Sequence, residues 1–229
     1  MKFGGFQKTS LLEYPDRISA IVWTVGCNFK CPFCYNTALV EGNVELIPED
    51  EILSFLKKRK GMLEALSISG GEPLLQKDIA DFTAKVKKLE YLVKIDTNGM
   101  YPKKLKELID NKLVDYIAMD VKAPLERYQE VTRSKVKEEG IVRSVGIIKN
   151  SGLEYVFRTT VVPDLLGAED IKKISQMLNG AKSYQLQQFV PVNTIDSHYM
   201  QKKPYTREEI QTFAKIADPY FSEIRIEGV

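Results

Sequence analysis

The sequence alternates between two kinds of segment, and this alternation most constrains the fold. Short apolar, β-branched runs are separated by charged stretches whose apolar residues recur at helical spacing. Apolar strands that alternate with helices form parallel sheets covered by helices, joined by right-handed crossovers. The sequence therefore predicts an α/β fold, a partial (β/α)6 barrel of parallel strands with the helices outside. The predicted strands are 18–24, 65–69, 92–96, 116–120, 155–161, 184–189 and 224–227, and the predicted helices are 48–60, 76–88, 102–111, 138–150, 168–178 and 206–217.

Composition limits the domain count and the partners of the chain. No linker, internal repeat or low-complexity stretch interrupts the 229 residues, so we expect residues 1–229 to form a single domain. The net charge of +2 implies no strongly charged partner, neither nucleic acid nor an anionic membrane surface. No apolar run approaches the roughly 20 residues that span a bilayer, and the first residues lack the apolar core of a signal peptide. These features predict a cytoplasmic protein.

All three cysteines, Cys27, Cys31 and Cys34, lie within one short segment. A reducing compartment keeps such thiols available as metal ligands. Because a zinc ion or a four-iron cluster takes four ligands, three cysteines predict a [4Fe-4S] cluster with one open iron. The alternative is a zinc site completed by His198, which lies far outside typical zinc-ligand spacing. Phe33, beside Cys34, can present its ring face to a bound heterocycle.

Further polar residues lie where the predicted strands end. In parallel barrels this edge carries the active site, whereas a fold without a site would scatter its polar residues over both ends. Their convergence with the cysteines predicts one active site at the C-terminal ends of the strands. These residues are Gly70, Gly71 and Glu72 after the second strand, Asp96 and Asn98 at the third, Asp120 and Lys122 at the fourth, and Arg158 within the fifth.

The turn that follows the second predicted strand has two interpretations. Gly70 and Gly71 permit close approach of a ligand to the backbone. Glu72 then binds a cationic ammonium group. In the alternative interpretation, Glu72 caps a tight turn between a strand and a helix.

The charged residues of the later strands also have alternatives. Asp96 and Asp120 either hold a cation and orient hydroxyl groups, or cap turns. Lys122 and Arg158 would be costly to bury unpaired, so a carboxylate ligand is expected to satisfy them. For Lys122, exposure to water is the alternative.

These motifs together resemble a known family. The cysteine segment, followed by Gly70-Gly71-Glu72-Pro73 on a six-unit barrel, resembles the radical S-adenosylmethionine superfamily. Within it, four segments look like the activating proteins of anaerobic ribonucleoside-triphosphate reductase, so the resemblance runs through most of the chain. The segments are QKTSLLEYP (7–15), VGCNFKCPFC (25–34), DVKAP (120–124) and RTTVVP (158–163).

The resemblance implies a role for each candidate residue. The three cysteines would bind three irons, and S-adenosylmethionine would chelate the fourth through its amine and carboxylate. One-electron reduction, with flavodoxin or ferredoxin as the donor, would yield methionine and a 5′-deoxyadenosyl radical. Glu72 would hold the ammonium group, Lys122 and Arg158 the carboxylate, Phe33 the adenine, and Asp96 and Asp120 a monovalent cation, with Gly70, Gly71 and Asn98 completing the cofactor site.

In the activating proteins, the radical takes a hydrogen atom from a glycine of a partner glycyl-radical enzyme. The implied partner is anaerobic ribonucleotide reductase. One departure is Tyr35-Asn36, where activating proteins often carry His-Asn after the third cysteine. Two alternatives stay open: a radical enzyme with a small-molecule substrate, such as a deazapurine-forming synthase, and a non-catalytic metal-binding scaffold.

Overall fold

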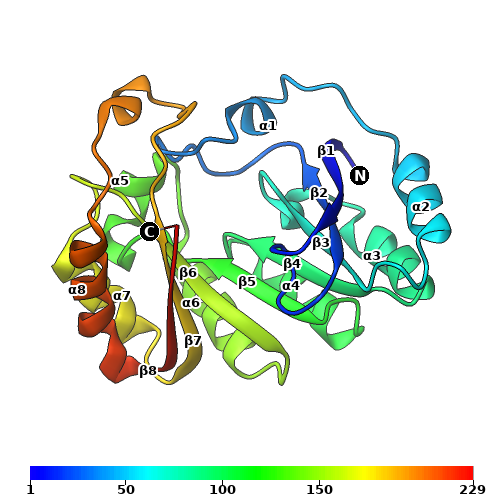
Figure 1. Cartoon of the computed structure of the whole chain (residues 1–229). Helices are drawn as coiled ribbons and strands as arrows, with labels where there is room; N and C mark the ends of the chain where they lie inside the picture. Colours follow the sequence, from blue (N-terminus) through cyan, green and yellow to red (C-terminus); the bar gives the residue numbers. More distant parts are fainter. Residues whose placement is uncertain (229) are drawn as a thin grey trace.

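The computed structural model describes residues 1–228 and contains one eight-stranded sheet whose spatial order follows the chain, β1 to β8. Strands β2 to β8 are parallel, and β1 pairs antiparallel with β2 (Figure 1). The sheet is open, with β1 and β8 at its edges, which confirms the predicted partial barrel. The strands are β1 (Phe3–Ser10), β2 (Ser19–Thr24), β3 (Ala65–Gly70), β4 (Leu92–Thr97), β5 (Tyr116–Asp120), β6 (Glu154–Val161), β7 (Ala181–Gln188) and β8 (Phe221–Glu227).

Helices cover the outer face of the curved sheet, as Figure 1 shows for α3, α4, α6, α7 and α8. All six predicted helices are present, with ends shifted by a few residues. The α-helices are α1 (Thr37–Glu41), α2 (Glu49–Lys58), α3 (Ile79–Lys88), α4 (Pro102–Asp110), α5 (Tyr128–Thr132), α6 (Glu138–Lys149), α7 (Ala168–Met177) and α8 (Arg207–Ala217). Four 3-10 turns complete the chain, η1 (Pro73–Leu75), η2 (Leu125–Arg127), η3 (Ser197–Gln201) and η4 (Asp218–Tyr220).

Strand β1 is the one strand that the sequence pattern did not predict. It contains two glycines, which weaken a strand signal, and its middle is exposed. A Cβ atom on Gly5 would lie 2.9 Å from Cε3 of Trp23 on β2. The glycine therefore leaves room for the Trp23 side chain, and its low strand propensity explains why the sequence pattern did not predict this strand.

The interior contains two separate clusters of buried hydrophobic residues. The main core fills the space between the sheet and its helices. A second, small core lies among residues near the starts of the strands, where the rings of Tyr14 and Tyr116 pack 5.7 Å apart with Ala65 and Val156. This core packs the loop before β2 against the starts of the strands.

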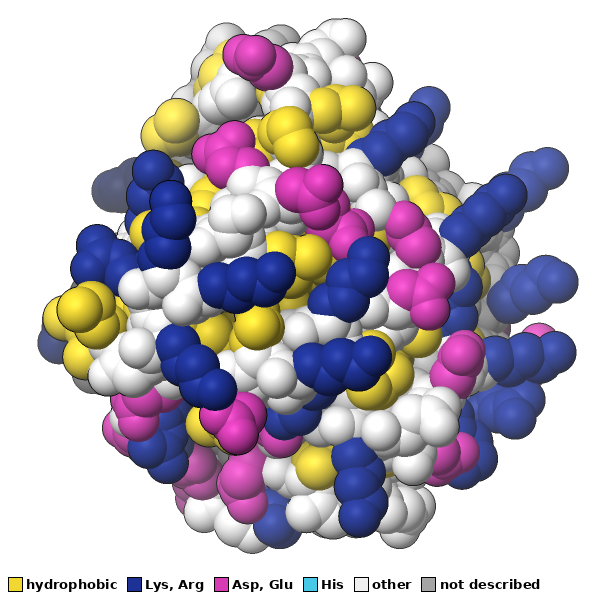
Figure 2. All heavy atoms as spheres, turned by 90° about the vertical axis from the view of Figure 1, so that its right-hand side faces the viewer, with side chains coloured by type: hydrophobic (Ala, Val, Ile, Leu, Met, Phe, Trp, Pro, Cys, Tyr) yellow, Lys and Arg dark blue, Asp and Glu magenta, His cyan; other side chains and the backbone are white. Residues whose placement is uncertain are grey.

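The face on the side of α2 and α3 carries many Lys and Arg side chains interspersed with Asp and Glu (Figure 2). Several are paired across elements, such as Lys85 with Glu49 at 2.7 Å and Lys60 with Glu90 at 2.5 Å. This mixed surface agrees with the small net charge of +2. In the described part of the chain, no helix has the length and apolar character needed to cross a membrane.

Candidate functional site

A cavity of about 910 Å³ lies inside the barrel and, at the C-terminal ends of the strands, brings together all the residues that the sequence nominated. Its walls come from the loops before and after β2 and from strands β2 to β8. The nominated residues that line it are Cys27, Cys31, Phe33, Cys34, Gly70, Gly71, Glu72, Asp96, Asn98, Asp120, Lys122 and Arg158.

The cysteine loop, residues 27–34, is held between two distant segments. The N–H of Lys30 donates to the carbonyl oxygen of Thr132, the last residue of α5, at 3.0 Å. On the other side, the N–H of Ile195 donates to the carbonyl oxygen of Cys34, at 3.1 Å. Ile195 and Asp196, which precede η3, thus pack on the cysteine loop, and the N–H of Asp196 donates to the carbonyl oxygen of Pro32 at 2.9 Å. The thiols are therefore fixed in position by the fold.

Burial dominates the electrostatics of the thiols. It raises the pKa of both Cys27 and Cys31 to about 12 and also raises that of Cys34, while the charge of Lys122 acts in the opposite direction on all three. A metal centre binds the thiolate form, so ligation must supply the energy of deprotonation. A cation beside the thiols reduces that energy.

The donor set of the cavity fits a cluster better than a single ion. Within residues 1–228, no three His, Cys, Asp or Glu side chains converge closely enough to hold one metal ion. Thiolates that bind separate corners of a cubic cluster need not converge on one atom. The alternative of a zinc site completed by His198 is therefore not formed among the described residues.

The turn after β3 locks against the start of the cysteine loop. Gly70 has a φ of +116°, and a Cβ atom there would lie 2.3 Å from the amide nitrogen of Thr24. A Cβ atom on Gly71 would lie 2.0 Å from the carbonyl oxygen of Gly26. Main-chain hydrogen bonds of 2.9 Å join Gly71 to Thr24 and Glu72 to Gly26. The two glycines thus let the ends of β2 and β3 pack directly against each other, while the predicted approach of a ligand to this backbone stays a prediction.

Glu72 is fully buried, and its carboxylate accepts three hydrogen bonds. Oε1 accepts from the Leu74 N–H at 3.0 Å and the Thr97 hydroxyl at 2.7 Å, and Oε2 accepts from the Asn98 N–H at 2.7 Å. Burial raises the pKa of Glu72 to about 7, against the effect of these donors. The structural role foreseen for Glu72, capping of the turn, is present in the molecule.

Asn98 contacts the cysteine loop directly. Its side-chain amide donates to Oδ1 of Asn28 at 2.9 Å and approaches Sγ of Cys27 at 3.9 Å. Phe33 is buried and belongs to the main core while also lining the cavity. Both residues therefore join the cysteine loop to the barrel wall.

A chain of five alternating charges crosses the ends of β4, β5 and β6. Its links are Lys94 to Asp96 at 2.5 Å, Asp96 to Arg158 at 3.4 Å, Arg158 to Asp120 at 2.8 Å, and Asp120 to Lys122 at 3.0 Å. Burial alone would raise the pKa of both carboxyls, but Arg158 and the lysines hold the pKa of Asp96 and of Asp120 below its ordinary value. Both carboxylates are therefore paired with cations of the chain itself.

Sequence reasoning missed several residues of the cavity. Lys94 was read as part of an apolar strand, although a charge two positions before Asp96 on the same strand face was a usable signal. Gln185 and Gln187 of β7 and Glu227 of β8 also line the cavity. The alternation Gln185-Leu186-Gln187 indicates that one face of this strand is polar, but it does not indicate that this face points into the cavity.

Comparisons with known proteins agree with this geometry. The family model of the Radical SAM superfamily matches residues 21–178. A protein of Methanocaldococcus jannaschii that bears the provisional name of glycyl-radical enzyme activating enzyme is 34% identical over 98% of this chain and 95% of its own length. A second M. jannaschii protein with the same provisional name is 27% identical over 97% of this chain and 85% of its own length.

The solved structures also agree on the fold. The crystal structure of Streptococcus suis SuiB bound to precursor peptide SuiA has a TM-score of 0.72 at 17% identity and covers 91% of this chain. This chain spans about half of SuiB, 48% of its length, so the likeness concerns the fold alone. Taken with the three cysteines at an open barrel end, these matches establish that the chain belongs to the radical S-adenosylmethionine superfamily.

Proposed function

We propose that the protein activates a glycyl-radical enzyme. A [4Fe-4S] cluster with S-adenosylmethionine, which membership of the family implies, supplies a 5′-deoxyadenosyl radical by one-electron reduction. The radical takes a hydrogen atom from a glycine of the partner enzyme, for which we propose anaerobic ribonucleotide reductase. The observation that carries the activating role is the 34% identity, over nearly the whole chain, to the M. jannaschii protein.

Cys27, Cys31 and Cys34 are the proposed ligands of three irons. They are the only cysteines of the chain, and the fold clamps their loop at the cavity wall. Asn98 is proposed to hold the loop from the barrel side, through its contacts with Asn28 and Cys27. Phe33 is proposed to lie against the adenine of the cofactor.

The charge chain is suited to a carboxylate ligand. Lys122 ends the chain and pairs with one carboxylate, Asp120, at 3.0 Å, so its ammonium group can donate further hydrogen bonds. A carboxylate bound there would accept from Lys122 with Arg158 beside it, without leaving an unpaired ion in the interior. We therefore propose these two residues as the partners of the cofactor carboxylate. The monovalent cation at Asp96 and Asp120 stays a prediction, because both carboxylates already contact cations.

Glu72 can contribute to ammonium binding while it caps the turn. A carboxylate oxygen has two lone pairs, and Oε1 uses both for Leu74 and Thr97. Oε2 accepts one hydrogen bond, from Asn98, so it can accept one more. We propose that this second position of Oε2 faces the ammonium group of S-adenosylmethionine.

The test is electron paramagnetic resonance on anaerobically reconstituted, chemically reduced protein. A reduced cluster signal that changes on addition of S-adenosylmethionine supports an open iron site. Addition of anaerobic ribonucleotide reductase from the same organism should then produce a glycyl radical, and reduced flavodoxin or ferredoxin should replace the chemical reductant. Release of 5′-deoxyadenosine without a radical on the partner would refute the activating role, and zinc in place of iron would refute the radical chemistry.

A further inference from the structure

The wall of the cavity formed by β6, β7 and β8 carries polar side chains that the cofactor assignments leave unused. In the strand register, Arg158 lies beside Gln185, which lies beside Arg225, and one row higher Thr160 lies beside Gln187, which lies beside Glu227. All six residues line the cavity. The two rows therefore extend the polar lining of the cavity from the charge chain to strands β7 and β8.

Hydrogen bonding fixes the orientation of the two glutamines. The amide nitrogens of Gln185 and Gln187 both donate to Oε2 of Glu227, the second at 3.0 Å. A carboxylate oxygen can only accept, so both amides must turn their NH2 groups toward it. Their carbonyl oxygens then point away from Glu227. The three side chains, which we call the acceptor trio, thus offer acceptors without a matching supply of donors.

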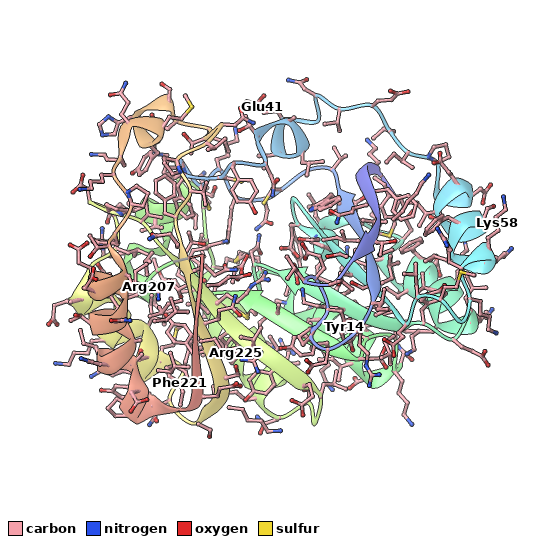
Figure 3. The ribbon with its side chains drawn as sticks, in the orientation of Figure 1. Tyr14, Glu41, Lys58, Arg207, Phe221 and Arg225 are labelled. Carbon is pink, nitrogen blue, oxygen red and sulfur yellow. The ribbon has the colours of Figure 1, made fainter. Side chains whose placement is uncertain are left out.

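Two arginines flank the acceptor trio, and both are already paired with carboxylates. Arg158 and Arg225 lie on either side of Gln185 in its row. Arg158 contacts Asp96 and Asp120, and Arg225 contacts Glu223 at 2.8 Å. Figure 3 labels Arg225 on β8, the edge strand of the open sheet. The acceptors of the trio therefore call for N–H donors without a further charge, and the main chain of a polypeptide is rich in them.

We propose that Gln185, Gln187 and Glu227 form a substrate-positioning site that binds main-chain N–H groups of the glycine-bearing segment of the partner protein. The inference rests on the proposed function and adds the part of the cavity that holds the substrate. The cysteines and the acceptor trio line the same cavity from different strands, so a segment bound at the trio lies in the space that the cofactor site opens into.

Two variants test the site, with a matched control. Gln187→Leu removes a polar group at similar size, and Glu227→Gln removes the charge and replaces one acceptor oxygen by an NH2 donor in the group that orients both glutamines. Glu154→Gln makes the same change on the exposed start of β6, outside the cavity lining. With anaerobic ribonucleotide reductase as the substrate, we expect the two cavity variants to raise KM about tenfold, the range expected when a bound N–H donor loses its acceptor, with a smaller effect on kcat. Iron content and affinity for S-adenosylmethionine should stay at the wild-type level.

A pair of synthetic peptides tests the main-chain chemistry directly. Both span the glycine segment of the reductase, and one carries N-methyl groups on the amides that flank the glycine. Methylation should weaken binding to the wild-type holoprotein about tenfold and should weaken binding to Gln187→Leu much less, because the acceptor is already absent. Equal weakening in both proteins overturns the proposal.

The outcomes separate this inference from the proposed function. If the wild-type protein produces no glycyl radical on the reductase, the proposed function fails, and the site loses its substrate with it. If the wild-type protein produces the radical and both cavity variants keep its KM, only the positioning site fails. A loss of S-adenosylmethionine affinity in the variants also overturns it, because the trio would then belong to the cofactor site.

Discussion

The substitution Arg158→Met tests the charge chain most directly. The Arg158 side chain is 14% exposed and donates from Nε to Asp120 at 2.8 Å and from Nη1 to Asp96 at 3.4 Å. Loss of one partner of a buried ion pair destabilises a protein by about 3–5 kcal/mol, because the other charge stays buried and unpaired. Each aspartate keeps a lysine here, Lys94 or Lys122. We therefore expect the lower end, a loss of about 3 kcal/mol in the free energy of unfolding near neutral pH.

The pH dependence of that loss identifies its cause. In the wild type, Asp96 and Asp120 have pKa values below their unfolded values, so their stabilisation is present above about pH 4 and is lost as the pH falls further. Without Arg158, burial raises both pKa values, and the variant can relieve its unpaired charge by binding protons. The difference between the two proteins should therefore shrink by about 1 kcal/mol or more from about pH 7 to about pH 5.

Urea unfolding followed by circular dichroism, at several pH values, measures this difference. The matched control is Arg17→Met, because Arg17 also contacts a carboxylate, Glu64 at 2.8 Å, with both side chains nearly half exposed. Exposed pairs contribute about 1 kcal/mol or less, so the control should be close to the wild type at every pH. A loss for Arg158→Met that is as small as the control, or that does not change with pH, would refute the buried charge chain.

Three further substitutions test the remaining parts of the site. Cys31→Ala should abolish the cluster, since two thiolates cannot hold it, and four irons per chain in the purified variant would contradict the ligand set. Glu72→Ala should lower the free energy of unfolding by about 2–4 kcal/mol, because three buried donors lose their acceptor, and unchanged urea unfolding would contradict the capping role. Gly71→Ala should displace the cysteine loop through the contact with Gly26 and reduce iron retention. The control Gly146→Ala, where a Cβ atom has open space, should leave iron retention unchanged. Equal iron content in the two variants would contradict the close packing of Gly71 on the cysteine loop.

The fold was predictable because its signals are local. Strands β2 to β6 coincide with largely apolar runs and β7 and β8 with alternating apolar and polar residues, and a segment with helical spacing lies between successive strands from β2 onward. The order of the sheet then follows from the rule that successive units are neighbours with right-handed crossovers. Strand β1 was not predicted because Gly4 and Gly5 have low strand propensity. Both glycines lie against neighbouring side chains that leave little room for a Cβ atom. Residue propensities along the sequence do not reveal such contacts between distant residues.

The position of the candidate site was predictable from sequence, but the partners of its side chains were not. Strand ends are visible in the sequence, so the convergence of the cysteines, Glu72 and Asp120 at one edge followed from the fold class alone. Which charges pair there depends on register between strands, for example Asp120 beside Arg158. The same dependence on register hid Lys94. Because a buried charge is tolerated only with its partners in place, the register of β4 to β6 decides which cations of this cavity are left with capacity for a further partner. Lys122, which contacts Asp120 alone at the end of the charge chain, is the cation that the register leaves available to a carboxylate ligand.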